Sequence, residues 1–196
     1  IIGCQLDVDF SDEAAVSGQV HSHSAPQRPL VLIATSEEGY ANLIQLVSRA
    51  YLENSDGGAA RLGIGWLAGS VEGVIALTGG ARGAIGSLLL EHSELAEKRL
   101  TRLKDLFGDR LYVELQRQDG YDPRIEAQTL ELAYRHGLPL VATNEAFFAA
   151  PDDCEAHDAL LAIADGALMS DDNRRRLGPD YCLQSQAHMS ALFADL

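Results

Sequence analysis

The order of apolar segments along the chain constrains its fold more than any other feature. Five short runs rich in Val, Ile and Leu recur: IIGCQLDV at 1–8, PLVLIAT at 29–35, GVIALTG at 73–79, RLYVELQ at 110–116 and LPLVATN at 138–144. A stretch with helical periodicity follows each of them except the first. Alternation of buried strands and helices is typical of α/β proteins, so the sequence predicts a parallel sheet or a (β/α) barrel.

The helical stretches carry recognisable start and stop signals. Residues 36–53 place five apolar side chains on one predicted helical face, namely Tyr40, Leu43, Ile44, Val47 and Tyr51. Thr35 and Glu38 have the spacing of a capping box at the start of this helix. Gly108 and Gly137 are placed to end the next two helices, and 151–166 and 185–196 predict two more. Two polar stretches, 9–29 and 53–63, predict loops.

The charge of the chain argues against nucleic-acid binding by this segment. Acidic residues number 29 against 15 Lys and Arg, for a net charge of −14. Phosphate backbones require clustered Lys and Arg, and the one dense basic run, Asn173 to Arg176, directly follows two aspartates. The three scattered cysteines, Cys4, Cys154 and Cys182, are typical of thiols in a reducing cytoplasm. We find no signal peptide or apolar run of membrane-spanning length.

Two histidine-containing stretches are candidate metal sites. His21 and His23 would face the same side of an extended strand, as in many metal sites. They lie in a polar stretch before a strand, so a solvated loop is the favoured interpretation. The second stretch, DDCEAHD at 152–158, combines acids with Cys154 and His157. Acids are also favoured at a helix N-terminus by the helix dipole, and we favour that interpretation here.

The glycine-rich stretch LTGGARGAIG at 77–86 follows a predicted strand and opens a helix, which makes a phosphate-binding loop worth testing. The dinucleotide fingerprint would need a glycine at Ala81 or Arg82, and the Walker lysine is absent. A tight strand-to-helix turn is therefore the favoured interpretation. The sequence has no GxSxG motif and no cysteine beside a plausible base, so nucleophilic catalysis has no support.

Six stretches together resemble one family. In chain order they are EEGYANLIQLVSRAYLE, EGVIALTGGARGAIG, FGDRLYVELQRQDG, GLPLVATNEAFF, PDDCEAHDALLAIADG and LFADL. They resemble the N-terminal PHP domain (polymerase and histidinol phosphatase) of bacterial DNA polymerase III alpha subunits. The resemblance runs from residue 1 to residue 196 and implies a single PHP domain with a distorted (β/α) barrel of about seven strands.

The resemblance also implies an internal piece of a longer protein, incomplete at its N-terminus. The chain starts within a predicted strand and ends within a predicted helix. The first strand or strands of the barrel, with the family's own His-x-His, are expected before Ile1, and all polymerase domains after Leu196. An open barrel edge along 1–8 would favour partner contacts or self-association there.

The remaining metal-ligand positions of the family fall, by resemblance, on four residues of this chain: Gln5, Gln118, Glu145 and Phe147. Neutral amides are weak ligands for such metals, and a phenyl ring cannot ligate. Glu145 alone keeps a carboxylate, and one acid cannot repay the desolvation of a metal cluster. We therefore expect no catalytic residue, no metal and no cofactor in this segment, although Mg²⁺ is expected in the polymerase domain of the parent protein.

By resemblance, the parent protein is a DNA-directed DNA polymerase, a nucleotidyltransferase of DNA replication in the cytoplasm. The expected role of this segment is structural, as a module that docks the proofreading exonuclease subunit, contacts other polymerase III holoenzyme subunits and braces the polymerase core. DNA would be bound by the parent and not by this acidic segment, and no membrane would be involved. Two alternatives stay open: an active metallophosphoesterase of the PHP superfamily, and the PHP domain of the error-prone polymerase relative.

Overall fold

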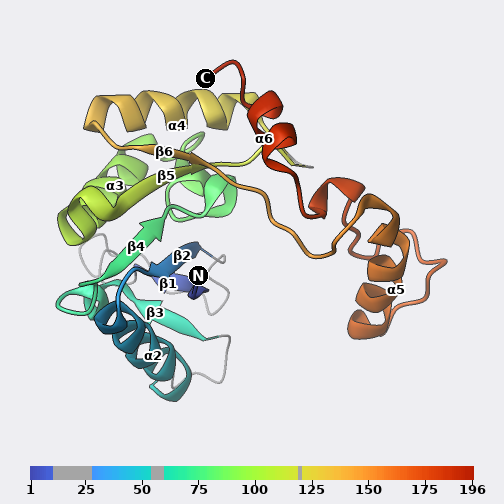
Figure 1. Ribbon diagram of the computed structural model, residues 1–196, viewed down its shortest axis with the longest axis horizontal. Coiled ribbons are helices and arrows are strands. Elements are labelled where there is room, and N and C mark those ends of the chain that lie inside the picture. The colour runs from blue at the N-terminus through green and yellow to red at the C-terminus, as the bar shows by residue number, and fades with distance from the viewer. Residues whose placement is uncertain (11–27, 54–59, 119–120) are drawn as a thin grey trace. The chain divides into compact units, whose positions relative to one another are not determined.

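The computed structural model describes residues 1–10, 28–53, 60–118 and 121–196 (Figure 1). These residues form two compact units. Unit 1 comprises Ile1–Glu114 and Pro123–Val141, and unit 2 comprises Leu115–Asp122 and Ala142–Leu196. Within the described parts of the chain, no helix is long and apolar enough to cross a membrane.

A six-stranded sheet forms the centre of unit 1. Its strands are β1 (Gly3–Asp9), β2 (Pro29–Ala34), β3 (Arg61–Gly63), β4 (Val74–Leu77), β5 (Leu111–Leu115) and β6 (Leu140–Ala142). Their order is β3-β1-β2-β4-β5-β6, so the described strands form an open sheet rather than a closed barrel. The five predicted strands are all present, and the α/β class is confirmed. The sequence analysis missed β3, because its three residues lie in a polar stretch and only Leu62 among them is buried.

The sheet is mixed, and the prediction of a parallel sheet is wrong for two of its pairs. Strand β2 runs antiparallel to both β1 and β4, whereas β1–β3 and β4–β5 are parallel. A parallel neighbour needs a crossover connection, usually a helix. After α2 the chain passes first to β3, on the side of β1 opposite to β2, before it reaches β4. Apolar runs identify strands but do not give their direction.

Strand β1 is not an open edge along its whole length, contrary to the sequence-based expectation. Residues Gly3–Asp7 pair with β2, and Asp7–Asp9 also pair with β3 on the other side. Only the first half of β1 therefore has one unpaired side among the described residues. The driving force for association along this strand is correspondingly reduced.

Helix α2 (Glu37–Leu52) packs beside β2 and β3 (Figure 1), and the face that it turns inward overlaps only in part with the predicted one. Its buried residues are Gly39, Leu43, Leu46 and Ala50. Of the predicted face, Leu43 is buried and Val47 packs against the core, as expected. Its other members are exposed, with Tyr40 at 45%, Ile44 at 48% and Tyr51 at 70% of full exposure. Small residues decide the orientation, because a Cβ added at Gly39 would lie 1.8 Å from the carbonyl oxygen of Gly73.

The start of α2 also lies one residue beyond the predicted cap. The hydroxyl of Ser36 accepts a hydrogen bond from the Gly39 N–H at 3.1 Å and is the N-cap. The Thr35 hydroxyl instead donates to the Gly73 carbonyl at 2.9 Å, and so does the Thr35 N–H, at 2.8 Å. Thr35 therefore links the N-terminus of α2 by hydrogen bonds to the turn before β4.

Helices α3 (Ser93–Phe107) and α4 (Pro123–His136) complete unit 1, with short 3-10 turns at Ile64–Leu67, Gly80–Arg82, Gly86–Leu88 and Gly108–Arg110. Both helices end at a glycine with positive φ, Gly108 at 60° and Gly137 at 61°, as predicted. The core of unit 1 is aliphatic, and its fully buried side chains include Leu30, Leu32, Leu62, Leu100, Leu103, Leu111 and Phe107.

Unit 2 contains α5 (Cys154–Asp165), α6 (Gln186–Leu192) and 3-10 turns at Pro151–Asp153 and Pro179–Tyr181. Gly166, with φ 65°, ends α5, at the last residue of the predicted helical stretch 151–166. Arg117, which follows β5, binds the chain at the end of α6. Its guanidinium donates to the Leu192 carbonyl at 2.6 Å and to both carboxylate oxygens of Asp195, at 2.6 and 2.8 Å. It also lies 4.7 Å from the centre of the Phe193 ring.

Candidate functional site

The four residues at the family's ligand positions do not all lie in one compact unit. Gln5 is exposed on β1 of unit 1. Gln118, Glu145 and Phe147 belong to unit 2, on the segments that follow β5 and β6. Gln118 is buried, Glu145 half-buried, and Phe147 55% exposed.

Gln118 and Glu145 are joined through the backbone of Glu145. The Gln118 Oε1 accepts the Glu145 N–H at 2.8 Å, and the Gln118 Nε2 donates to the Glu145 carbonyl at 2.9 Å. The same Nε2 reaches the Asp180 carbonyl at 3.3 Å. An amide has one acceptor and one donor end, and here both are used by backbone groups. The Gln118 side chain therefore acts as a clamp between three loop segments.

Two more amide side chains form hydrogen bonds near this clamp. The Asn144 Nδ2 donates to the carbonyls of Asp180 and Cys182, at 3.2 and 2.8 Å. The Gln116 Nε2 donates to the Thr143 hydroxyl at 3.2 Å. The segments after β5 and β6, where an α/β enzyme would place its chemistry, are thus held by neutral amides that bind backbone groups and one hydroxyl.

Phe147 packs against aromatic neighbours. Its ring centre lies 5.7 Å from that of His157 and 6.0 Å from that of Tyr181, and Phe148 contacts His157 from 5.3 Å. The Phe147 N–H donates to the Tyr181 carbonyl at 2.9 Å. These are ordinary ring-packing distances, so His157 has a structural environment among aromatic rings.

The DDCEAHD stretch lies at the start of α5, as predicted, and its residues have separate partners. Asp153 accepts the Ala150 N–H at 3.0 Å, and the Cys154 thiol donates to the Leu177 carbonyl at 3.3 Å. Asp158 is held by a bidentate ion pair with Arg174, whose hydrogen bond lowers the pKa of that carboxyl. Among the residues that the structure describes, no three His, Cys, Asp or Glu side chains are grouped closely enough to hold a metal ion.

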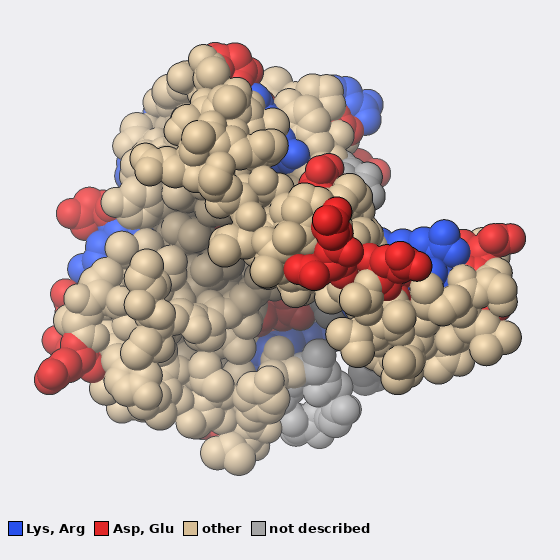
Figure 2. Space-filling view, turned by 45° about the vertical axis from the view of Figure 1, so that its right-hand side comes forward, with Lys and Arg blue, Asp and Glu red and all other residues tan. Residues whose placement is uncertain are grey.

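The basic run that ends at Arg176 is used within unit 2. Arg174 pairs with Asp158, Arg175 contacts Asp165 at 3.3 Å, and Arg176 donates to the Asp171 carbonyl at 3.2 Å. Figure 2 shows Asp and Glu in several groups on one face of the molecule, with smaller groups of Lys and Arg. Arginines that are already bonded to acidic neighbours are poorly available to bind a phosphate backbone.

The glycine-rich turn after β4 is occupied by an internal anion. Gly79 and Gly80 both have positive φ, at 81° and 59°, and the Gly79 N–H donates to the carboxylate of Glu114 at 2.9 Å. The Thr78 hydroxyl in turn accepts the Glu114 N–H at 2.9 Å. A donor that a phosphate would use is taken by a buried side chain, in agreement with the predicted turn. Sequence reasoning overlooked Glu114, although an acid within the apolar run RLYVELQ signals a buried partner.

Strand β1 carries two groups with altered acidity. Burial raises the pKa of the Cys4 thiol. Burial also raises the pKa of Asp7, and the charge of Arg61 partly opposes this effect. His21 and His23, the first candidate metal pair, lie outside the described residues.

Comparisons with known proteins show what the chain is similar to. A family model described as PHP domain matches residues 1–118. Proteins named DNA polymerase III subunit alpha align with the chain: that of Caulobacter vibrioides is 38% identical over 100% of this chain and 17% of its own length. That of Pseudomonas aeruginosa is 36% identical over 87% of the chain and 15% of its own length. That of Escherichia coli K12 is 34% identical over 97% of the chain and 16% of its own length. The chain thus spans about a sixth of these relatives.

Proposed function

The chain belongs to the PHP domain family, and from this premise we propose that it is the PHP portion of a bacterial DNA polymerase III alpha subunit. The proposal rests on one alignment: the entire chain aligns with the Caulobacter vibrioides protein of that name, over 17% of the length of that protein. The parent protein would then be a DNA-directed DNA polymerase that acts in replication in the cytoplasm. Nucleotide transfer, with its Mg²⁺, and DNA binding would belong to parts of the parent outside this chain.

Within that protein, the segment would be a metal-free structural module. Both ends of the Gln118 amide form hydrogen bonds with backbone groups, and its oxygen brings no negative charge to a cation. The Phe147 ring has no donor atom, and Gln5 offers a neutral amide. The polar side chains here donate hydrogen bonds to backbone carbonyls, and they are not carboxylates that converge on one point. This supports a structural role for this part of the fold.

The partners would be the proofreading exonuclease subunit and other subunits of the polymerase III holoenzyme, which the module would dock while it braces the polymerase core. We further propose that the open mixed sheet is part of a distorted (β/α) barrel. The PHP domain would extend beyond the matched residues 1–118 to include Leu196.

The metal-free proposal can be tested by titration of the intact protein with Zn²⁺ and with Mn²⁺ in a calorimeter, alongside hydrolysis of p-nitrophenyl phosphate. A variant carrying Gln118→His, Glu145→Asp and Phe147→His supplies family-type ligands and is the matched comparison. We expect no stoichiometric Zn²⁺ binding and no hydrolysis by the natural protein. Micromolar, stoichiometric Zn²⁺ binding that the single change Glu145→Ala abolishes would favour the metallophosphoesterase alternative instead.

The docking proposal has its own test. Sedimentation of the intact protein with the exonuclease subunit of the same organism should give a stable complex. The complex should be lost when residues 1–196 are exchanged for an unrelated α/β domain. Retention of the complex after that exchange would show that the exonuclease docks elsewhere.

A further inference from the structure

Helices α3 and α4 of unit 1 border a groove of about 370 Å³. We call it the α3–α4 groove, and its lining residues come from the turn before α3 and from the facing sides of the two helices: Leu89, Leu90, Ser93, Glu94, Glu97, Gln128, Glu131, Leu132 and Arg135. All of them belong to unit 1, and none is one of the four residues at the family's ligand positions. The groove is therefore a separate feature from the site described above.

Leucines supply the apolar part of the groove. Leu89 and Leu132 are buried, at 2% and 7% exposure, and form part of the core of unit 1. Leu90 is 43% exposed. A leucine left in contact with water beside buried leucines gives a partner side chain an apolar surface to cover.

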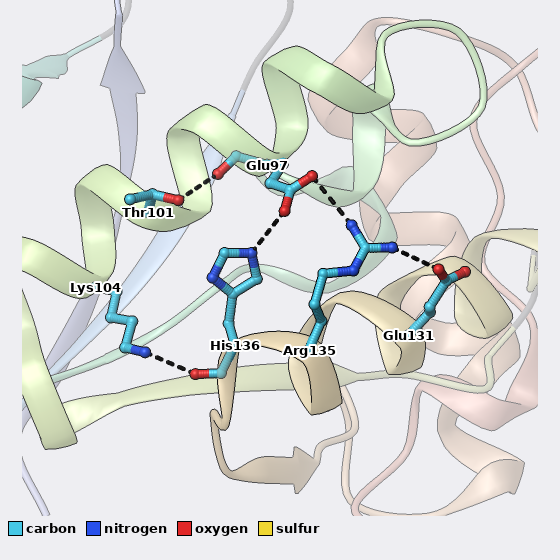
Figure 3. A network of polar contacts seen from close by, with 6 residues as sticks. All are labelled: Glu97, Thr101, Lys104, Glu131, Arg135 and His136. Carbon is cyan, nitrogen blue, oxygen red and sulfur yellow. Dashed lines mark hydrogen bonds and ion pairs between the residues drawn. The ribbon is translucent and has the colours of Figure 1, made fainter.

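Acids dominate the polar part of the groove. Glu97 and Glu131 both contact Arg135, which bridges α3 and α4 (Figure 3). On its other oxygen, Glu97 meets the Nε2 of His136 at 2.9 Å, and Lys104 donates to the His136 carbonyl at 2.7 Å. The hydrogen bond from His136 lowers the pKa of Glu97, so this carboxylate stays charged in mildly acidic solution. These contacts join α3 and α4 beside the groove.

A second hollow of about 410 Å³ continues from the first around the start of α3. It is lined by Glu91, His92, Ser93, Glu94, Leu95 and Lys98, and it shares Ser93 and Glu94 with the α3–α4 groove. Neither Glu91 nor Glu94 forms an ion pair with any residue in the described part of the chain. An acid in the first turn of α3 would be explained by the helix dipole alone. Across the two hollows, four acids (Glu91, Glu94, Glu97 and Glu131) outnumber two bases (Lys98 and Arg135), so the lining is negatively charged overall.

We propose that the α3–α4 groove binds a Lys- or Arg-containing amphipathic segment of a partner protein. An aliphatic side chain of that segment would cover Leu90, and its cations would face Glu91 and Glu94 and would share the exposed Glu131 with Arg135. Complementary charge selects this occupant. The same charge repels nucleic acid and anionic membrane, because both present phosphate.

The test uses three fluorescein-labelled 14-residue helical peptides with the intact protein. One combines Leu with Lys, one replaces each Lys with Glu, and one replaces each Leu with Ser. We expect binding of the Leu/Lys peptide alone, measured by fluorescence anisotropy, and weaker binding as salt is raised. A photoreactive group on this peptide should crosslink within 89–98 and 128–135, as mapped by mass spectrometry.

Matched variants separate the groove from general acidity. The double change Glu94→Lys and Glu131→Lys should weaken binding at least tenfold, and Leu90→Ser should weaken it severalfold. Asp105→Lys, an exposed acid on the same helix outside both hollows, should leave binding within twofold. Unchanged thermal unfolding of each variant shows that the fold is kept. The proposal fails if crosslinks fall elsewhere, if Asp105→Lys weakens binding as much as the double change, or if the Ser/Lys peptide binds equally well.

Discussion

The contact between Gly39 and Gly73 gives the sharpest test of how α2 is placed, because helix propensity and packing predict opposite outcomes for Gly39→Ala. Propensity alone predicts a gain of about 1 kcal/mol, since alanine is the better helix former. Packing predicts a loss. The new Cβ would lie 1.8 Å from the Gly73 oxygen and 2.5 Å from its carbonyl carbon, and real Cβ atoms essentially never approach within 3.0 Å.

Moving the Gly73 carbonyl away from the new methyl group would cost stability. The Gly73 carbonyl accepts hydrogen bonds from both the N–H and the hydroxyl of Thr35, and breaking them costs about 1–3 kcal/mol together. Overpacking against backbone adds roughly 1–3 kcal/mol. After the propensity gain is subtracted, we expect Gly39→Ala to lower the free energy of unfolding by about 1–5 kcal/mol. For a chain of this size that lowers Tm by roughly 2–20 °C.

Trp66 makes the measurement specific for unit 1. It is the only tryptophan of the chain, and the Arg49 guanidinium of α2 lies 4.4 Å from the centre of its ring. Urea unfolding followed by its fluorescence therefore reports on α2 and its neighbours. The control is Gly65→Ala, where no atom lies within 4 Å of the added Cβ and the change should stay within about 0.5 kcal/mol. A Gly39→Ala protein as stable as the natural one would refute the reasoning.

Three further outcomes are expected. Phe107→Ala removes one of the largest fully buried side chains and should lower the free energy of unfolding by about 3–5 kcal/mol, as measured by urea titration. Gln118→Ala leaves the Glu145 backbone without its partners and should cost about 1–3 kcal/mol, with faster exchange of the Glu145 amide as the direct readout. Arg117 lowers the pKa of Asp195, so this pair stabilises the fold above the ordinary aspartate pKa, and the stabilisation is lost as pH falls through the lowered value. Hydrogen exchange of α6 should accelerate across that window, and Asp195→Asn should remove the dependence on pH.

The sequence predicted the positions of most elements because their signals are local. Apolar runs identified five strands, and Gly108 and Gly137 marked helix ends where positive φ is required. Strand direction, the three-residue strand β3 and the inward face of α2 depend on contacts distant in sequence. The α2 face shows why: apolar count favours Tyr40 and Ile44, whereas close approach to Gly73 requires Gly39 inside.

For the candidate site, the sequence could identify which residues occupy the ligand positions but not what those residues contact. Gln118 is an unremarkable amide in the sequence, and its double hydrogen bond to Glu145 joins residues 27 positions apart. Glu114 is the counterexample, because an acid inside an apolar strand already predicts a specific internal donor. That donor, the Gly79 N–H, was hidden within a glycine-rich turn that suggested phosphate binding.

The anchoring of α6 by Arg117 has a consequence for the order in which the chain folds during synthesis. Arg117 and Asp195 are 78 residues apart. At ribosomal rates of about 5–20 residues per second, Asp195 is synthesised roughly 4–16 s after Arg117. Tyr121, whose ring centre lies 5.9 Å from the guanidinium, follows within a second. The strands of unit 1 therefore have time to assemble first, and docking of α6 through Arg117 comes as a late step of folding on the ribosome.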